Sequence, residues 1–193
     1  MKQLRHELSV IYNGLYRAIF IDNCRIHSIR KFLNKHDILV DTVDVSKYSL
    51  SRSGYVKTAN CNMGTGEIKI YLVNGNLKEF NDDRKNFFAE LMSVIAHELK
   101  HRHQRYHDFG RTYADRKHEI DAYAFGVAVA LRILNFESYH EILVNKTLNK
   151  GVLVSASTFF NGKSSSYVSK NLFEQKLSTF LKYKDYLYRE NVA

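Results

Sequence analysis

Proline and tryptophan are absent from this chain of 193 residues, and cysteine occurs only twice, at Cys24 and Cys61. Two cysteines are too few for a disulfide-stapled scaffold or a cysteine-rich zinc module. No apolar run approaches the roughly 18 residues that a membrane-spanning helix needs, and charges interrupt the N-terminal segment where a signal peptide would be apolar. Because 45% of the residues are hydrophobic, the composition is not that of a disordered chain. We therefore expect a globular, cytoplasmic protein that does not enter a membrane.

Acidic residues are scarce at the two ends of the chain. Residues 1–36 hold seven Lys or Arg against two acids, and residues 142–193 hold eight against three, whereas residues 37–141 hold fourteen against fifteen. The formal net charge of +9 therefore comes from the flanks. Lysines that keep exposed helices in solution are the simpler explanation, and binding of nucleic acid or another polyanion by the flanks is the alternative.

The spacing of apolar residues predicts an α+β protein. Leu4, Leu8, Ile11 and Leu15 recur at helical spacing, and an interruption is expected near Asp22. Alternating apolar residues predict strands, and the Gly64-Thr65-Gly66 turn predicts a hairpin between two of them. Helices are expected at 3–21, 26–33, 84–108, 115–135, 138–149 and 170–189, and strands at 38–45, 55–61 and 67–73.

We expect one domain over residues 1–193, because no linker or internal repeat divides the sequence. Its parts are an N-terminal helical flank (1–36), a core (37–141) and a basic C-terminal helical extension (142–193). The predicted architecture is a small, mostly antiparallel sheet packed on the helix of residues 84–108 and on the helix that follows it.

The segment His97-Glu98-Leu99-Lys100-His101 is the most informative part of the chain. On a helix, residues four apart lie on one face, one turn apart, so both imidazoles can reach the same metal ion. Glu98 lies beside them and can take a proton from a water molecule that the metal activates. The motif sits in a strongly apolar helix, where unpaired polar groups are costly to bury. The pattern therefore predicts a catalytic zinc site, which needs a third protein ligand.

Two residues are candidates for the third ligand. His107 lies ten residues after His97, the outer spacing of metzincins, but Gln104 stands where that class has glycine, and no methionine follows the motif to form its Met-turn. On an unbroken helix, His107 would lie on another face than His101, so we expect it and His103 to face solvent. The other candidate is Glu119, near the start of the next helix.

Glu119 begins a stripe of small residues on its helix. Positions 119, 122, 126 and 130 share one face and are occupied by Glu, Ala, Gly and Ala. Such a face allows a close approach to the helix that carries the two histidines, which a short carboxylate needs to reach the same metal. Asp121, two residues after Glu119, is expected to point away from it.

The HExxH motif followed by Glu119-x-Asp121-Ala122-x-x-Phe125 resembles the gluzincin-type metallopeptidases, and most closely the ImmA/IrrE-like and phage-encoded HExxH peptidases. The resemblance covers about residues 55–126. It implies a minimal zincin-like fold, zinc held by His97, His101 and Glu119, and Glu98 as general base. Tyr123, one turn after Glu119, is the candidate for stabilising the oxyanion.

The sequence therefore predicts a zinc-dependent metalloendopeptidase. A protein or peptide substrate would pair with an edge strand, either 55–61 or 67–73. The alternative is a zinc-bearing structural or nucleic-acid-associated protein, such as a phage virion component, with secondary or lost peptidase activity. A third possibility, SprT-like cleavage of DNA-bound proteins, would require a third histidine instead of Glu119. The loop predicted at 155–169 could cover the site.

Overall fold

The structure is a computed structural model, and it describes residues 2–22, 25–44, 55–74, 77, 83–107, 116–135 and 170–189. The predicted short helix 138–149 and the predicted loop 155–169 lie outside the described residues.

The helices are α1 (Lys2–Tyr16), the π-helical turn η1 (Arg17–Ile21), α2 (Ile26–Asn34), α3 (Arg84–His107), α4 (Arg116–Leu134) and α7 (Lys170–Arg189). The strands are β1 (Ile38–Val43), β2 (Val56–Cys61) and β3 (Ile68–Val73). The predicted α+β class is confirmed.

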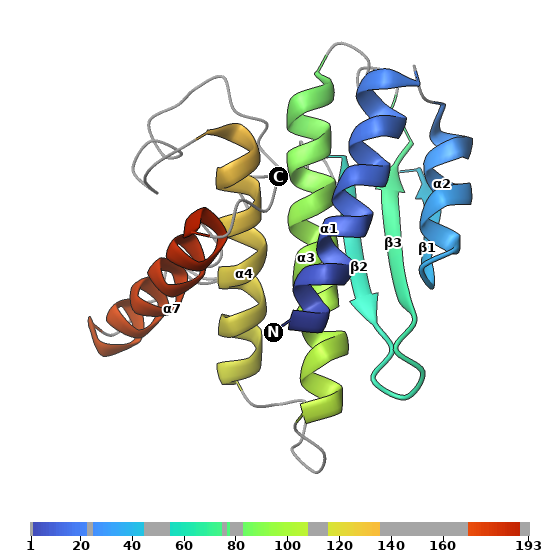
Figure 1. Cartoon of the computed structure of the whole chain (residues 1–193). Helices are drawn as coiled ribbons and strands as arrows, with labels where there is room; N and C mark the ends of the chain where they lie inside the picture. Colours follow the sequence, from blue (N-terminus) through green and yellow to red (C-terminus); the bar gives the residue numbers. More distant parts are fainter. Residues whose placement is uncertain are drawn as a thin grey trace.

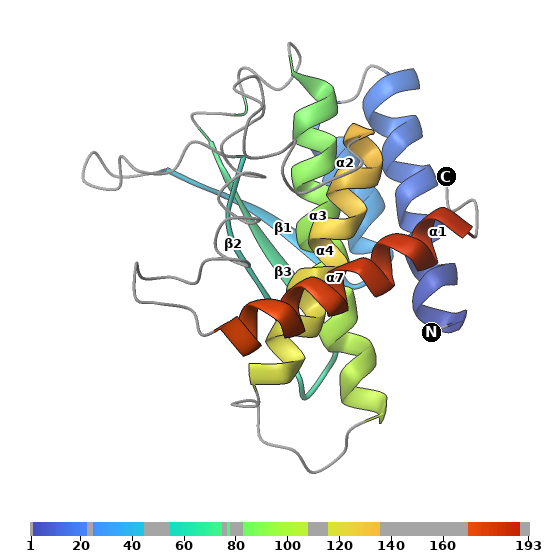
Figure 2. The same ribbon diagram turned by 90° about the vertical axis from the view of Figure 1, so that its left-hand side faces the viewer.

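Helix α3 lies in the middle of the molecule (Figure 1). It packs against α4 on one side and against β2 and α1 on the other, and α7 covers the far side of α4. Seen from the side, the three strands lie apart from α4 and α7, with α7 crossing in front of α4 (Figure 2). One cluster of buried hydrophobic residues joins all of these elements.

The sheet is mixed, which corrects the prediction of a mostly antiparallel one. Its strand order is β1-β3-β2, with β1 parallel to β3 and β2 antiparallel to β3. Strand β3 is central, so the segment 67–73 offers no free edge. In the part of the chain that the structure describes, β2 is the one of the two predicted substrate-binding segments that lies at an edge of the sheet. The direction and position of β1 depend on a long-range pairing that the alternation of apolar residues does not specify.

The predicted β2–β3 hairpin is confirmed. The Asn62 side-chain oxygen accepts hydrogen bonds from the backbone N–H groups of Gly64 (2.8 Å) and Thr65 (3.1 Å), as in an Asx turn. Gly66 closes the turn with a φ of 80°, a conformation that glycine adopts without steric cost. This turn sets the register in which Cys61 faces Ile68.

The N-terminal helix buries the predicted stripe. Leu4, Leu8, Ile11 and Leu15 are fully buried, and a π-helical turn follows in which the Asp22 N–H donates to the Arg17 carbonyl at 3.0 Å. The helical spacing thus ends near Asp22, as expected from the sequence.

Two buried charged residues of α3 attach it to the sheet. The Glu90 carboxylate accepts hydrogen bonds from the backbone N–H groups of Tyr55 (3.0 Å) and Val56 (2.9 Å), where β2 begins. Three turns further along α3, Arg102 donates to the carbonyls of Gly66 (2.7 Å), His36 (3.2 Å) and Asp37 (3.0 Å). The helix therefore fixes the start of β2, the β2–β3 turn and the turn before β1.

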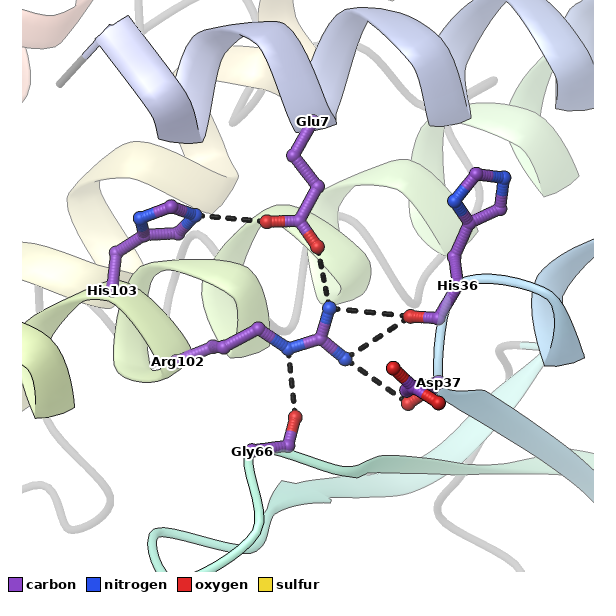
Figure 3. A network of polar contacts seen from close by, with 6 residues as sticks. All are labelled: Glu7, His36, Asp37, Gly66, Arg102 and His103. Carbon is purple, nitrogen blue, oxygen red and sulfur yellow. Dashed lines mark hydrogen bonds and ion pairs between the residues drawn. The ribbon is translucent and has the colours of Figure 1, made fainter.

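Arg102 also joins α3 to the N-terminal helix (Figure 3). It forms an ion pair with Glu7, whose second carboxylate oxygen lies 2.8 Å from Nε2 of His103. The expectation that His103 faces solvent is wrong, because the side chain is buried against α1 by this pairing.

None of the helices in the described part of the chain combines the length and apolar character required to cross a membrane.

We predict that Arg102→Met lowers the free energy of unfolding by about 2–4 kcal/mol, because it leaves three carbonyls and a partly buried carboxylate without their donor. Urea denaturation measures the change. Arg17→Met is the matched control: Arg17 pairs with Asp22 on the surface, where its side chain is 74% exposed, so its loss should change stability by less than about 0.5 kcal/mol. Equal effects of the two variants would contradict the structural role of Arg102.

Candidate metal centre

The two histidines of the HExxH motif lie on one face of α3. Their Nε2 atoms are 3.0 Å apart and their ring centroids 4.7 Å apart. His101 is buried, and His97 is nearly so, with 14% of its side chain exposed. The rings converge because the helix places residues four apart one turn from each other.

Glu119 reaches these histidines from the first turn of α4. Its carboxylate oxygens lie 3.6 Å from Nε2 of His97 and 3.4 Å from Nε2 of His101. The small-residue stripe explains this reach, since a Cβ atom at Gly126 would lie only 2.6 Å from the Ser93 carbonyl oxygen and 3.4 Å from Cβ of His97. With no side chain at Gly126, α4 lies directly against the backbone of α3.

The three side chains lie close enough together to share one metal ion, since one ligand atom from each lies within 4.8 Å of the others. Ligand bonds of about 2.0–2.2 Å in tetrahedral geometry separate the ligand atoms by roughly 3.3–3.6 Å. The Nε2 atoms of His97 and His101 lie 3.6 Å and 3.4 Å from different Glu119 oxygens and 3.0 Å from each other, so small side-chain shifts would be needed to bind an ion. Among the described residues, these three are also the group of His, Cys, Asp and Glu side chains arranged to hold a metal. Two imidazoles and a carboxylate suit zinc with a fourth position left for water or substrate.

Glu98 is buried beside the metal-binding group. Its carboxylate lies 4.0 Å from Nε2 of His97, and it accepts a hydrogen bond from the backbone N–H of Cys61, at the end of β2. Burial raises the pKa of Glu98 to about 7, and the charge of Glu119 adds to this rise, whereas His101 and the Cys61 N–H lower it. A carboxyl group that titrates near neutral pH can both accept and donate a proton there.

Burial and charge act differently on the two histidines. Burial and the neighbouring His101 lower the pKa of His97 to about 3, so this ring is neutral at physiological pH and has a lone pair to offer a metal. Burial also lowers the pKa of His101, but the hydrogen bond and charge of Glu119, helped by Glu98 and Gln104, raise it above its ordinary value.

Tyr123 lies at the edge of the group. Its ring contacts that of His97 edge to face, with centroids 4.3 Å apart. Burial, together with the charges of Glu119 and Glu98, raises its pKa, so the phenol keeps its proton at neutral pH and can act as a hydrogen-bond donor. The other candidate ligand, His107, has a side chain outside the described residues.

Sequence reasoning missed the contacts of Gln104 and Asp121. The Gln104 side-chain oxygen lies 2.9 Å from Nδ1 of His101, and its amide donates to Asp121. Asp121 does point away from the metal-binding atoms, as expected, but toward α3 and α7. Residues three apart on a helix are in contact, so the spacing of His101 and Gln104 was the signal available for the contact between them.

Comparison with models of protein families, with curated proteins and with solved structures finds no match to this chain.

We predict that Gly126→Ala lowers the free energy of unfolding by about 1–3 kcal/mol and weakens zinc binding, because the added methyl group separates α4 from α3. Urea denaturation and isothermal titration calorimetry measure the two effects. Gly64→Ala, in the β2–β3 turn, is the control: its Cβ would lie 3.1 Å from the Asn62 side-chain oxygen and would meet no atom of α3 or α4. Unchanged zinc affinity in Gly126→Ala would show that the close approach does not set the position of Glu119.

A second prediction follows from the raised pKa of Glu98. Its folded-state pKa of about 7 exceeds the ordinary value of 4.5, so its contribution to stability is complete below pH 4.5 and is lost as the pH rises through 7. In the metal-free protein, Glu98→Gln should therefore raise the free energy of unfolding by about 1–3 kcal/mol at pH 8 and by much less at pH 5. Urea denaturation at both pH values measures this, with Glu67→Gln as control, because the Glu67 side chain is 38% exposed and lies outside the site. A gain that is equal at both pH values would contradict the assignment.

Proposed function

We propose that this protein is a zinc-dependent metalloendopeptidase with a zincin-like fold. The observation that carries the proposal is the convergence of His97, His101 and Glu119, whose ligand atoms lie within 4.8 Å of one another, with the buried Glu98 beside them. The resemblance of the two motifs to gluzincin-type peptidases supports the same conclusion. The α+β arrangement of an N-terminal helix, strands, motif helix and second ligand-bearing helix is compatible with a minimal zincin.

The position of Glu119 favours this reading over those that need a third histidine. Its two carboxylate oxygens face the Nε2 atoms of both motif histidines. A metzincin-like site would use His107, and a SprT-like site would use another histidine in place of the carboxylate. We therefore assign the protein to the gluzincin type, with His97, His101 and Glu119 as ligands.

Zinc, when bound by these residues, would polarise the scissile carbonyl and lower the pKa of a water molecule. Glu98 would take a proton from the water that attacks the carbonyl carbon, and would deliver it to the amine nitrogen as the C–N bond breaks. In the metal-free protein, burial raises the pKa of Glu98 to about 7, and a bound cation would lower it by stabilising the carboxylate. Tyr123, with its protonated hydroxyl beside His97, is our candidate for donating a hydrogen bond to the oxyanion.

We place an extended peptide substrate along the outer edge of β2. This strand lies against α3, and in the described part of the sheet its other edge pairs with β3. Its two ends are fixed by carboxylates of α3, since Glu90 binds the N–H groups of Tyr55 and Val56 and Glu98 binds that of Cys61. A substrate that pairs with the β2 backbone between Val56 and Cys61 would lie next to the carboxylate of Glu98.

Glu98→Gln tests the mechanism. The variant should still bind one zinc ion per chain, because Glu98 is not a ligand, and should lose peptide hydrolysis by about 10²–10⁴-fold. Zinc content by mass spectrometry and cleavage of a proteome-derived peptide mixture measure the two properties. Glu119→Ala should lose zinc and hydrolysis together, whereas Glu67→Gln should keep both.

Hydrolysis that persists in Glu98→Gln would overturn the assigned base. A wild-type protein that binds zinc through the three residues but cleaves no peptide in the mixture would favour the alternative, a zinc-bearing structural or nucleic-acid-associated protein. The exposed basic residues on α2 and at its two ends, Lys31, Arg25 and Lys35, are the observation that favours it.

A further inference from the structure

Gln104 makes three hydrogen bonds around the motif helix. It is buried, one turn after His101, and its side-chain oxygen Oε1 lies 2.9 Å from Nδ1 of that ring. Its side-chain nitrogen Nε2 donates to the backbone carbonyl of His118 (3.2 Å) and to the carboxylate of Asp121 (3.2 Å). The side chain thus bridges α3 and α4 immediately behind the metal-binding atoms.

These contacts decide which way the amide points. A backbone carbonyl and a carboxylate can only accept hydrogen bonds, so both must face the NH₂ group of Gln104. The amide oxygen must then face His101, and an oxygen there requires a proton on Nδ1. In the neutral ring, the other nitrogen, Nε2, then keeps its lone pair for a metal ion. It is also the atom that faces His97 and the Glu119 carboxylate, which without a metal competes for a proton on Nε2.

Asp121 is itself held from two further positions. Lys100 of α3 lies 3.0 Å from the same carboxylate oxygen that Gln104 contacts, and the hydroxyl of Tyr183 donates to the other oxygen. Tyr183 belongs to α7, is buried, and stacks under the Lys100 ammonium group, which lies 5.2 Å from the ring centroid. The C-terminal helix therefore contacts His101 through Tyr183, Asp121 and Gln104.

We propose that Gln104 is a positioning residue that holds His101 in the tautomer with its proton on Nδ1, and that Asp121 and Tyr183 of α7 keep Gln104 in this orientation. The proposal rests on the ligand role of His101 in the proposed function. Hydrogen bonds to the far nitrogen of a metal-binding histidine fix its tautomer and its direction, and their loss lowers metal affinity by about 10–100-fold. By this connection, zinc affinity depends on α7, a helix that supplies no ligand.

The tautomer itself can be measured without metal or activity. In the metal-free Glu119→Ala protein, where no carboxylate competes for a proton on Nε2, ¹⁵N NMR of the neutral imidazole should place the proton of His101 on Nδ1. A proton on Nε2 would overturn the proposal. Because the measurement needs neither zinc nor substrate, its failure is distinct from a failure of the peptidase assignment.

Zinc affinity then tests how the residues act together. Gln104→Met, similar in shape but without the amide, should weaken zinc binding by about 10–100-fold. Asp121→Leu should also weaken it, whereas Asp121→Asn should stay within about threefold of wild type, because the amide oxygen can still accept from Gln104 and Lys100. The double variant Gln104→Met/Asp121→Leu should bind no more weakly than Gln104→Met alone, because Asp121 acts through Gln104.

Gln3→Met, on the exposed face of α1, is the control for loss of a glutamine amide and should leave zinc affinity unchanged. Wild-type affinity in Gln104→Met, or losses that multiply in the double variant, would overturn the proposal. If Gln104→Met does not fold, Tyr183→Phe replaces it: removal of the hydroxyl should weaken zinc binding and lower the Nδ1–H population of His101 in the NMR measurement. A Tyr183→Phe protein unchanged in both respects would contradict the role of α7.

Discussion

The close approach of α3 and α4 is the constraint on which the proposed metal site depends. Gly126 lies so near the Ser93 carbonyl that even a methyl group would not fit between the helices. At this distance, the short side chain of Glu119 can meet two histidines that belong to the neighbouring helix. The same proximity allows Gln104 to hydrogen-bond both the backbone and a side chain of α4. A wider separation would leave the HExxH motif with two ligands and no third.

Helix α3 can occupy the centre of the molecule because its buried charged side chains have partners in other segments. Glu90 binds the start of β2, Glu98 its end, and Arg102 the turns that flank the sheet. Unpaired, such groups would cost several kcal/mol each on burial. The helix that carries the proposed catalytic groups is thus attached to strands and helices on all sides, which suits a site whose ligands must keep fixed positions.

The sequence allowed a good prediction of local features. Helical spacing predicted α1, α3, α4 and α7, the glycines at 64 and 66 predicted the β2–β3 hairpin, and the stripe at 119, 122, 126 and 130 predicted the close helix pair. Long-range pairings were not predictable in the same way. The parallel β1–β3 pairing depends on contacts between distant segments, and the burial of His103 depends on Glu7, 96 residues away along the chain. The periodicity of one helix contains no information on such a partner.

The electrostatics of the site are consistent with the metal ion that we propose. Burial disfavours the charged forms of both His97 and Glu98. It therefore favours loss of the proton from His97 and retention of a proton on Glu98. A divalent cation between His97, His101 and Glu119 would relieve this conflict, because neutral imidazoles bind it and its charge stabilises the two carboxylates nearby. The buried Glu98 and the partly exposed Glu119 beside two histidines would therefore be more favourable with a cation than without one. The chain also keeps Gln104 and Asp121 behind His101, where they orient the ring but place no further negative charge among the three ligand atoms. His97, His101 and Glu119 face the site, whereas Gln104 and Asp121 lie behind it. Residues that served stability alone would not need to be separated in this way.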